Sequence, residues 1–128
     1  MRRKSTTLTE QELEIMKIVW ERDSVTVRDV YEALLDRRKV AYTTVMTMMK
    51  ILEQKQYLKK NQADRAYVYR PAVDRIQATR NAVQQLVGRF FGDSPAALVL
   101  NLLEDETLEE PELEKIRELL QPEEGESK

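Results

Sequence analysis

The sequence contains neither cysteine nor histidine. This absence excludes zinc and copper sites built on thiolate or imidazole, cysteine nucleophiles and triads that need histidine. It also excludes disulfides, which is typical of a cytosolic protein. No apolar run approaches the roughly 20 residues that a membrane-spanning helix needs, and the opening MRRKSTTLTEQ leads into no apolar signal-peptide core. We therefore expect a cytoplasmic protein with no membrane insertion, no metal and no cofactor.

Glycine is scarce, with three residues at Gly88, Gly92 and Gly125. No glycine-rich loop is present that could hold a phosphate group. Carboxylates are frequent between Glu104 and Glu114, but on an exposed acidic segment they are more typical of solvated charge than of acid–base catalysis. A chain of 128 residues also makes one domain or two small ones, without a large catalytic cleft. The sequence therefore predicts no catalytic residues and no enzyme.

Charge is unevenly distributed along the chain. The net charge is −2, yet residues 1–70 carry 15 Lys and Arg against 10 Asp and Glu, whereas residues 71–128 carry 6 against 13. Between Arg37 and Arg70 the count is 9 basic to 2 acidic residues. This pattern favours a nucleic-acid-binding first part, followed by a part with a different role.

The centre of the basic region is the segment 41–56, which as a helix has two distinct faces. Apolar residues fall on one side: Val45, Met48, Met49 and Leu52. The opposite stripe contains no carboxylate and consists of Thr43, Thr47, Lys50 and Gln54. A helix in a DNA major groove must exclude carboxylates and present donors to bases and phosphates. The alternative is a surface helix that is merely poor in acid.

The surrounding segments predict a winged helix-turn-helix, in a fold that is mainly α with a small β-hairpin. Thr9 and Glu12 form a capping-box pattern before a helix that runs to about Arg22, and Thr26 begins a second helix to about Arg38. Val25 and Thr26 could form a one-rung strand. After the segment 41–56, residues 57–61 and 65–70 alternate as a β-hairpin. Its basic residues are expected to contact phosphates: Lys59, Lys60 and Arg65. The alternative is a ribbon that only covers the core.

The remaining chain predicts helices that begin near Asp74, Ser94 and Pro111. They carry more apolar surface than under 60 residues can bury alone. We expect residues 1–72 to be the DNA-binding domain and residues 73–128 to be a helical dimerisation domain, with a compact monomeric cap as the alternative. The predicted dimer residues are Leu86, Phe90, Phe91, Leu98, Leu102, Leu103, Ile116 and Leu120.

As a whole the sequence resembles the penicillinase and methicillin-resistance repressors of bacteria, the BlaI/MecI family. The stretches that carry the resemblance cover nearly the whole chain in order: LTEQELEIMKIVW, TVRDVYEALL, AYTTVMTMMKILEQKQYL, RAYVYRP and SPAALVLNLLEDE. The resemblance implies a homodimeric repressor whose winged helices bind a palindromic operator and whose C-terminal helices interlock. It places Thr43, Thr44 and Thr47 at recognition positions and Arg65 in the wing.

This sequence departs from the family pattern at two points. Similar sequences often carry Arg where Ile51 stands and Gly where Gln56 stands. Copper-responsive members hold their metal with C-terminal cysteines, which are missing here, so the resemblance does not extend to copper sensing. A winged helix that binds protein and not DNA is the alternative function, because this fold is used in both ways.

The resemblance also implies a mode of release. In such repressors a membrane sensor responding to β-lactams leads to proteolysis between Asn and Phe, and the matching pair here is Asn101 and Leu102. A protease pocket shaped for Phe would be underfilled by Leu102. The resemblance therefore makes Asn101-Leu102 a candidate cleavage site and a sensor-linked protease a candidate partner. The structural alternative is that Asn101 only caps the exposed edge of a buried helix.

Overall fold

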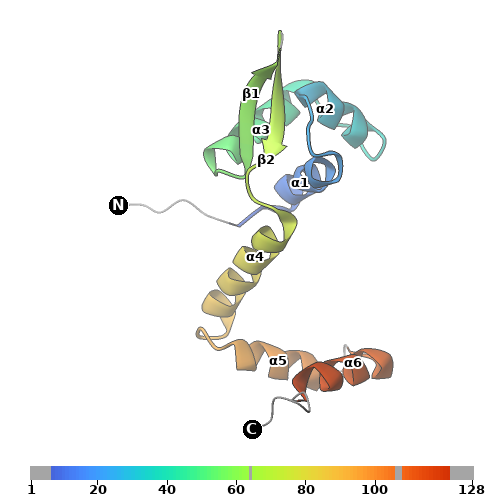
Figure 1. The fold of residues 1–128 in the computed structure, drawn as a ribbon, viewed down its shortest axis with the longest axis vertical. Helices are drawn as coiled ribbons and strands as arrows, with labels where there is room; N and C mark the ends of the chain where they lie inside the picture. Colours follow the sequence, from blue (N-terminus) through green and yellow to red (C-terminus); the bar gives the residue numbers. More distant parts are fainter. Residues whose placement is uncertain (1–6, 64, 106–107, 122–128) are drawn as a thin grey trace. The chain divides into compact units, whose positions relative to one another are not determined.

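The computed structural model describes residues 7–63, 65–105 and 108–121. The elements follow in the order α1 (Glu10–Arg22), α2 (Val27–Leu35), α3 (Tyr42–Gln54), β1 (Leu58–Ala63), β2 (Ala66–Pro71), α4 (Arg75–Phe90), α5 (Pro95–Glu104) and α6 (Glu110–Leu120) (Figure 1). The chain divides into two compact units, Met1–Gln85 and Leu86–Lys128. This division falls inside α4, and the expected functional boundary between residues 72 and 73 stays a prediction.

Capping boxes fix the starts of α1 and α2. Glu12 N donates to Thr9 Oγ1 at 3.1 Å while Thr9 N donates to Glu12 Oε1 at 2.8 Å, which confirms the predicted cap. Thr26 and Asp29 repeat this arrangement at α2. Helix α2 ends at Leu35, earlier than the expected Arg38, because the N–H groups of Arg37 and Arg38 both turn back to Leu34 O.

The core of the first unit lies where α1, α2, α3 and the base of the hairpin meet. Helix α3 contributes Val45, Met49 and Leu52, each with 0% exposure. The other members are Ile15, Met16, Ile18, Val19, Val25, Val30, Leu34, Tyr57, Leu58, Tyr69 and Ala78. Leu35, the last residue of α2, is 44% exposed.

The β-hairpin is antiparallel, with Leu58 opposite Pro71 and Ala63 opposite Ala66. Val25 and Tyr69 form an isolated bridge, with Val25 N donating to Tyr69 O at 3.0 Å, which confirms the expected single rung. The turn from α3 into β1 passes through Gln56, whose φ is +70°. That left-handed conformation favours glycine, which is the residue that similar sequences often carry where Gln56 stands.

Helix α4 begins as part of the first unit. Asp74 caps it by accepting from Gln77 N at 2.8 Å, and Ala78 belongs to the core. The Trp20 indole Nε1 donates to Val73 O at 2.9 Å, which fixes the segment that enters the helix. Trp20 is half-buried and acts as the structural anchor expected of it.

The second unit contains α5 and α6. Ser94 Oγ accepts from Ala97 N at 3.1 Å and Pro95 follows, so the predicted cap-then-proline start of α5 is confirmed. Gly92, with φ +57°, lies in the turn between α4 and α5, where the chain bends by 85°. Within the described ranges, no single helix is both long and apolar enough to cross a membrane.

Candidate nucleic-acid interface

Helix α3 presents the two faces that its sequence predicted. Val45, Met49 and Leu52 are buried in the core. The predicted contact residues Thr43, Thr44, Thr47, Lys50 and Gln54 are all exposed. The stripe that lacks carboxylates therefore faces outward.

A groove of about 640 Å³ lies between the start of α2, one edge of α3 and the hairpin. It brings together three predicted contact residues from different elements, Lys50, Lys60 and Arg65. The full lining is Thr26, Val27, Arg28, Tyr42, Met46, Lys50, Lys60, Arg65, Ala66, Tyr67 and Tyr69. None of these described lining residues is acidic, so the groove concentrates positive charge and suits an anionic partner.

Aromatic rings hold two of the cations in the groove. Lys60 Nζ lies 4.6 Å from the centre of the Tyr67 ring and 3.8 Å from Glu53 Oε1. The Arg28 guanidinium lies 5.8 Å from the centre of the Tyr42 ring. The ring contacts favour particular positions of the cations without neutralising their charge. The Glu53 carboxylate offsets part of the charge of Lys60.

Sequence reasoning missed Arg28, Tyr42 and Tyr67 as members of this surface. Tyr42 also packs edge-to-face on Tyr31, with ring centres 5.3 Å apart, which joins α3 to α2. Arg28 lies in the first turn of a helix otherwise recognised by its apolar repeat. The sequence did contain a signal for Arg28, namely a basic residue in the first turn of the helix that precedes the recognition helix.

Lys59 lies apart from the groove. Side chains alternate along a strand, so Lys59 projects from the face of β1 opposite to that of Lys60. Its cross-strand neighbour is Arg70, a second cation. The structure therefore does not bring Lys59 together with Lys50, Lys60 and Arg65, and its phosphate contact stays a prediction.

Helix α3 begins without a side-chain cap, as the structure describes it, because Ala41 occupies the N-cap position. Its first turn also contains no acidic residue. The first N–H groups of a helix need acceptors and carry partial positive charge. The start of α3, next to Thr43 and Thr44, is therefore compatible with a phosphate.

The other end of α3 is tied to the start of α1. Lys55 Nζ lies 2.8 Å from Glu12 Oε1 and donates to Thr7 O at 3.3 Å. Glu12 is 5% exposed and also accepts from Thr9 N, so one carboxylate serves the α1 cap and the end of α3 together. This contact fixes the direction of α3 relative to the rest of the first unit.

Tyr69 closes the base of the groove. Burial raises the pKa of its phenol above the ordinary value, and Lys60 acts in the opposite direction. The phenol therefore stays protonated in neutral solution, and no phenolate offsets the positive charge of Lys50, Lys60 and Arg65.

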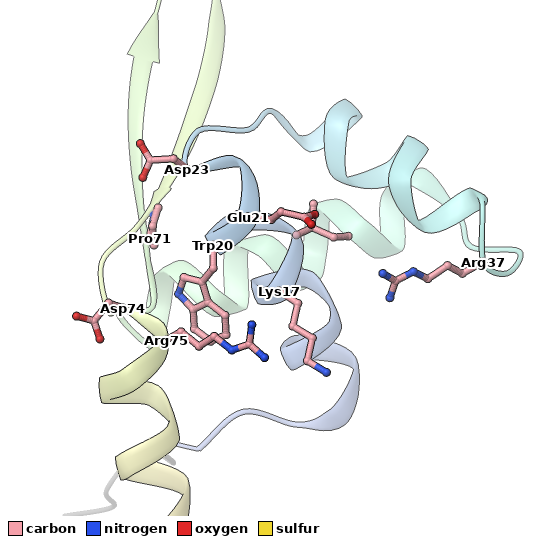
Figure 2. A pocket seen from close by; sticks show the side chains of 9 residues that line it. Lys17, Trp20, Glu21, Asp23, Arg37, Pro71, Asp74 and Arg75 are labelled. Atoms are coloured by element: carbon pink, nitrogen blue, oxygen red, sulfur yellow. The ribbon is translucent and has the colours of Figure 1, made fainter.

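A second hollow, of about 620 Å³, lies beside α1 and differs in charge (Figure 2). Its cations are Lys17, Arg37 and Arg75, and its carboxylates are Glu21, Asp23 and Asp74. Figure 2 shows Arg75 close to the Trp20 ring and Arg37 well apart from both. Because both signs alternate there, this hollow is a poorer site for a polyanion than the groove.

The residues predicted for dimerisation are largely uncovered. The exposed fractions are 40% for Leu86, 67% for Phe90, 41% for Leu102, 42% for Leu103 and 77% for Leu120. Phe91, Leu98 and Ile116 are half-buried. Asn101 is exposed, and its carbonyl accepts from Asp105 N at the end of α5.

The profile of one family, described as penicillinase repressor, matches residues 8–122. The chain belongs to the penicillinase repressor family. That membership confirms the family expected from the sequence. It also places the chain in a class of transcriptional repressors and not among known enzymes.

Curated relatives agree with this assignment. The transcriptional regulator BlaI of Mycobacterium tuberculosis is 42% identical over 99 residues, which is 75% of this chain and 72% of the relative. The penicillinase repressor of Bacillus licheniformis is 26% identical over 114 residues, or 89% of each chain.

A solved structure has the same fold. It is the solution structure of monomeric Bacillus licheniformis BlaI in complex with the blaP half-operator, with 28% identity and a TM-score of 0.50. The match covers 56% of this chain and 87% of that chain. It confirms the mainly α fold with a β-hairpin that the sequence predicted.

Proposed function

We propose that this chain is a homodimeric repressor that binds a palindromic DNA operator through α3 and the groove beside it. The observation that carries the proposal is the convergence of Lys50, Lys60 and Arg65 on one acid-free groove next to the exposed threonines of α3. A helix in the major groove beside a basic hairpin on the phosphates needs this combination. The half-operator bound by the related BlaI supports the same partner for this chain.

In this arrangement the residues have separate roles. Thr43, Thr47, Lys50 and Gln54 face base edges, and Thr44 lies at the side of that stripe. Lys60 and Arg65 neutralise phosphates from the hairpin. Loss of a base contact should cost about 1–3 kcal/mol and should relax specificity at one position, whereas loss of a phosphate contact should weaken all sequences alike.

Binding-site selection from random DNA, followed by salt titration, tests the proposal. The full chain should select a palindrome. Lys60→Glu and Arg65→Glu should each lower the log–log salt slope by about one. Lys17→Glu, which changes an exposed lysine of the second hollow, is the matched control and should leave the slope unchanged. If no sequence is enriched and binding partners are proteins, the winged helix is an interaction module instead.

The dimer is proposed from the second unit. Phe90, Leu119 and Leu120 are 67%, 80% and 77% exposed. Large apolar side chains exposed to this extent are typical of an interface. Sedimentation at micromolar concentration should give a dimer, and a monomer there would refute the proposal.

The most specific part of the proposal is release from DNA by proteolysis between Asn101 and Leu102. Both residues are exposed, but they lie inside α5, so a protease would need local opening of that helix. A cut there would remove the end of α5 and all of α6 and thereby weaken the dimer. Under β-lactam stress the host should contain a fragment that ends at Asn101. Full derepression with an intact chain would show another mode of release.

A further inference from the structure

Met46 is the most exposed of the large apolar side chains described on α3, where Tyr42 is 37% and Ile51 36% exposed. Met46 is 48% exposed and lines the groove, together with Tyr42 one turn before it and Lys50 one turn after it. Its neighbours in sequence behave differently, since Val45 is fully buried and Thr47 is an exposed contact candidate. Met46 is therefore outside the core and on the side of α3 that is open to a partner.

Support of the hairpin does not account for this exposure. Ala66, Tyr67 and Tyr69 of β2 share the groove with Met46, yet nearly half of the Met46 surface remains uncovered. A single exposed apolar residue on a protein surface is ordinary. Met46, however, is surrounded by the cations and hydroxyls that are expected to contact DNA. An apolar side chain at such an interface removes water from polar base edges without replacing the lost hydrogen bonds, unless it meets an apolar group on the DNA.

The major groove offers one apolar feature on a base edge, the C5-methyl group of thymine. We propose that Met46 contacts a thymine methyl group in each half-site and so determines specificity there. The inference rests on the proposed function, because it needs α3 in the major groove. Methionine suits the contact because its flexible, polarisable side chain adapts to a small apolar surface.

The position of Met46 relative to Lys50 restricts where this thymine lies. One helical turn advances about 5.4 Å along α3, and one base-pair step advances about 3.4 Å along DNA. The thymine should therefore lie within about two base-pair steps of the base or phosphate contacted by Lys50. A half-site without thymine in that neighbourhood would contradict the inference.

Uracil substitution tests the contact without disturbing any hydrogen bond, because uracil lacks only the methyl group. Each thymine of the selected operator is replaced in turn, symmetrically in both half-sites, and the dissociation constant of the full chain is measured. At one position the substitution should raise the dissociation constant by about fourfold per half-site, because one methyl group is no longer buried. Met46→Ala should bind thymine and uracil operators equally, and Met46→Leu should restore the discrimination.

Leu35→Ala is the matched control, because Leu35 is 44% exposed on α2 and does not line the groove. It should keep the full sensitivity to uracil. Tolerance of uracil at every position, or an equal loss in the Met46→Ala variant, would overturn the inference while leaving specific DNA binding intact. Failure of the proposed function looks different, since no operator would then be selected at all.

Discussion

The two units of this chain bury their apolar residues to very different extents. In the first unit, Leu34 on α2 is 1% exposed and Val30, Val45, Met49 and Leu52 are 0% exposed. In the second unit, none of the described residues on α5 or α6 is buried, and Leu119 and Leu120 are 80% and 77% exposed. Both units contain capped amphipathic helices, so the difference lies in what those helices pack against. The helices of the first unit pack on one another around a core. The described side chains of α5 and α6 have no comparable core to pack against.

This contrast suits the proposed combination of a rigid head and a reversible assembly. The capping boxes of α1 and α2, the Val25–Tyr69 bridge and the Lys55–Glu12 contact all fall within the first unit. They hold α3 and the hairpin in fixed relation, which a DNA-binding surface requires. The second unit exposes apolar area, and the proposed association would make its stability depend on the concentration of the partner.

Removing the second unit tests the contrast between the two units most directly and should have the largest effect on operator affinity. A fragment of residues 1–85 keeps the whole described core of the first unit and loses the exposed leucines. Its affinity for a full palindrome should fall roughly 10²–10⁴-fold, because the second head is no longer tethered. Electrophoretic mobility shift with full and half operators measures this. Equal affinity of fragment and full chain for the palindrome would show that the second unit does not assemble the heads.

Two matched leucines sharpen the comparison at the level of single residues. Leu34→Ala should lower the free energy of unfolding by about 2–5 kcal/mol, since it leaves a cavity in the core. Leu120→Ala removes the same atoms from a residue that is 77% exposed and should have a small effect in dilute protein, which grows with concentration as the dimer forms. Denaturant titrations at two protein concentrations separate these effects. A concentration-independent loss for Leu120→Ala would argue against the interface.

Lys50 on α3 and Lys55 at the C-cap of the same helix separate binding from stability. Lys55→Met leaves Glu12, which is 5% exposed, without its cation and should cost about 1.5–3 kcal/mol of stability. Lys50→Met changes an exposed lysine and should alter stability by less than about 0.5 kcal/mol, while it weakens operator binding. Thermal unfolding and DNA titration of both variants give the comparison. Equal stability losses would contradict the separate roles.

The smallest effect concerns the backbone between α3 and β1. Gln56 holds φ at +70°, so Gln56→Gly should relieve strain and stabilise the first unit by about 1 kcal/mol. Gln56→Ala keeps a Cβ in the same conformation and is the control, without the gain. Chemical denaturation at one protein concentration is sufficient. If glycine is no better than alanine, the left-handed turn carries no measurable strain.

Much of the fold followed from local patterns in the sequence. The Thr9–Glu12 box, the start of α2 at Thr26, the alternation of the hairpin and the Ser94-Pro95 start were each predicted, and each is present. These features depend on neighbours three or four residues apart or on strand alternation, which sequence displays directly. The end of α2 was missed because it depends on a turn at Leu34.

The candidate site divides in the same way. The sequence alone determined which side of α3 is polar and free of carboxylates, because helical periodicity assigns residues to faces. Tertiary structure decided which residues from other elements join it. It brought Arg28, Tyr42 and Tyr67 beside Lys50, Lys60 and Arg65, and placed Lys59 on the other face of the hairpin. These contacts depend on how helices and strands that are far apart in the sequence pack together, and local sequence patterns do not predict them.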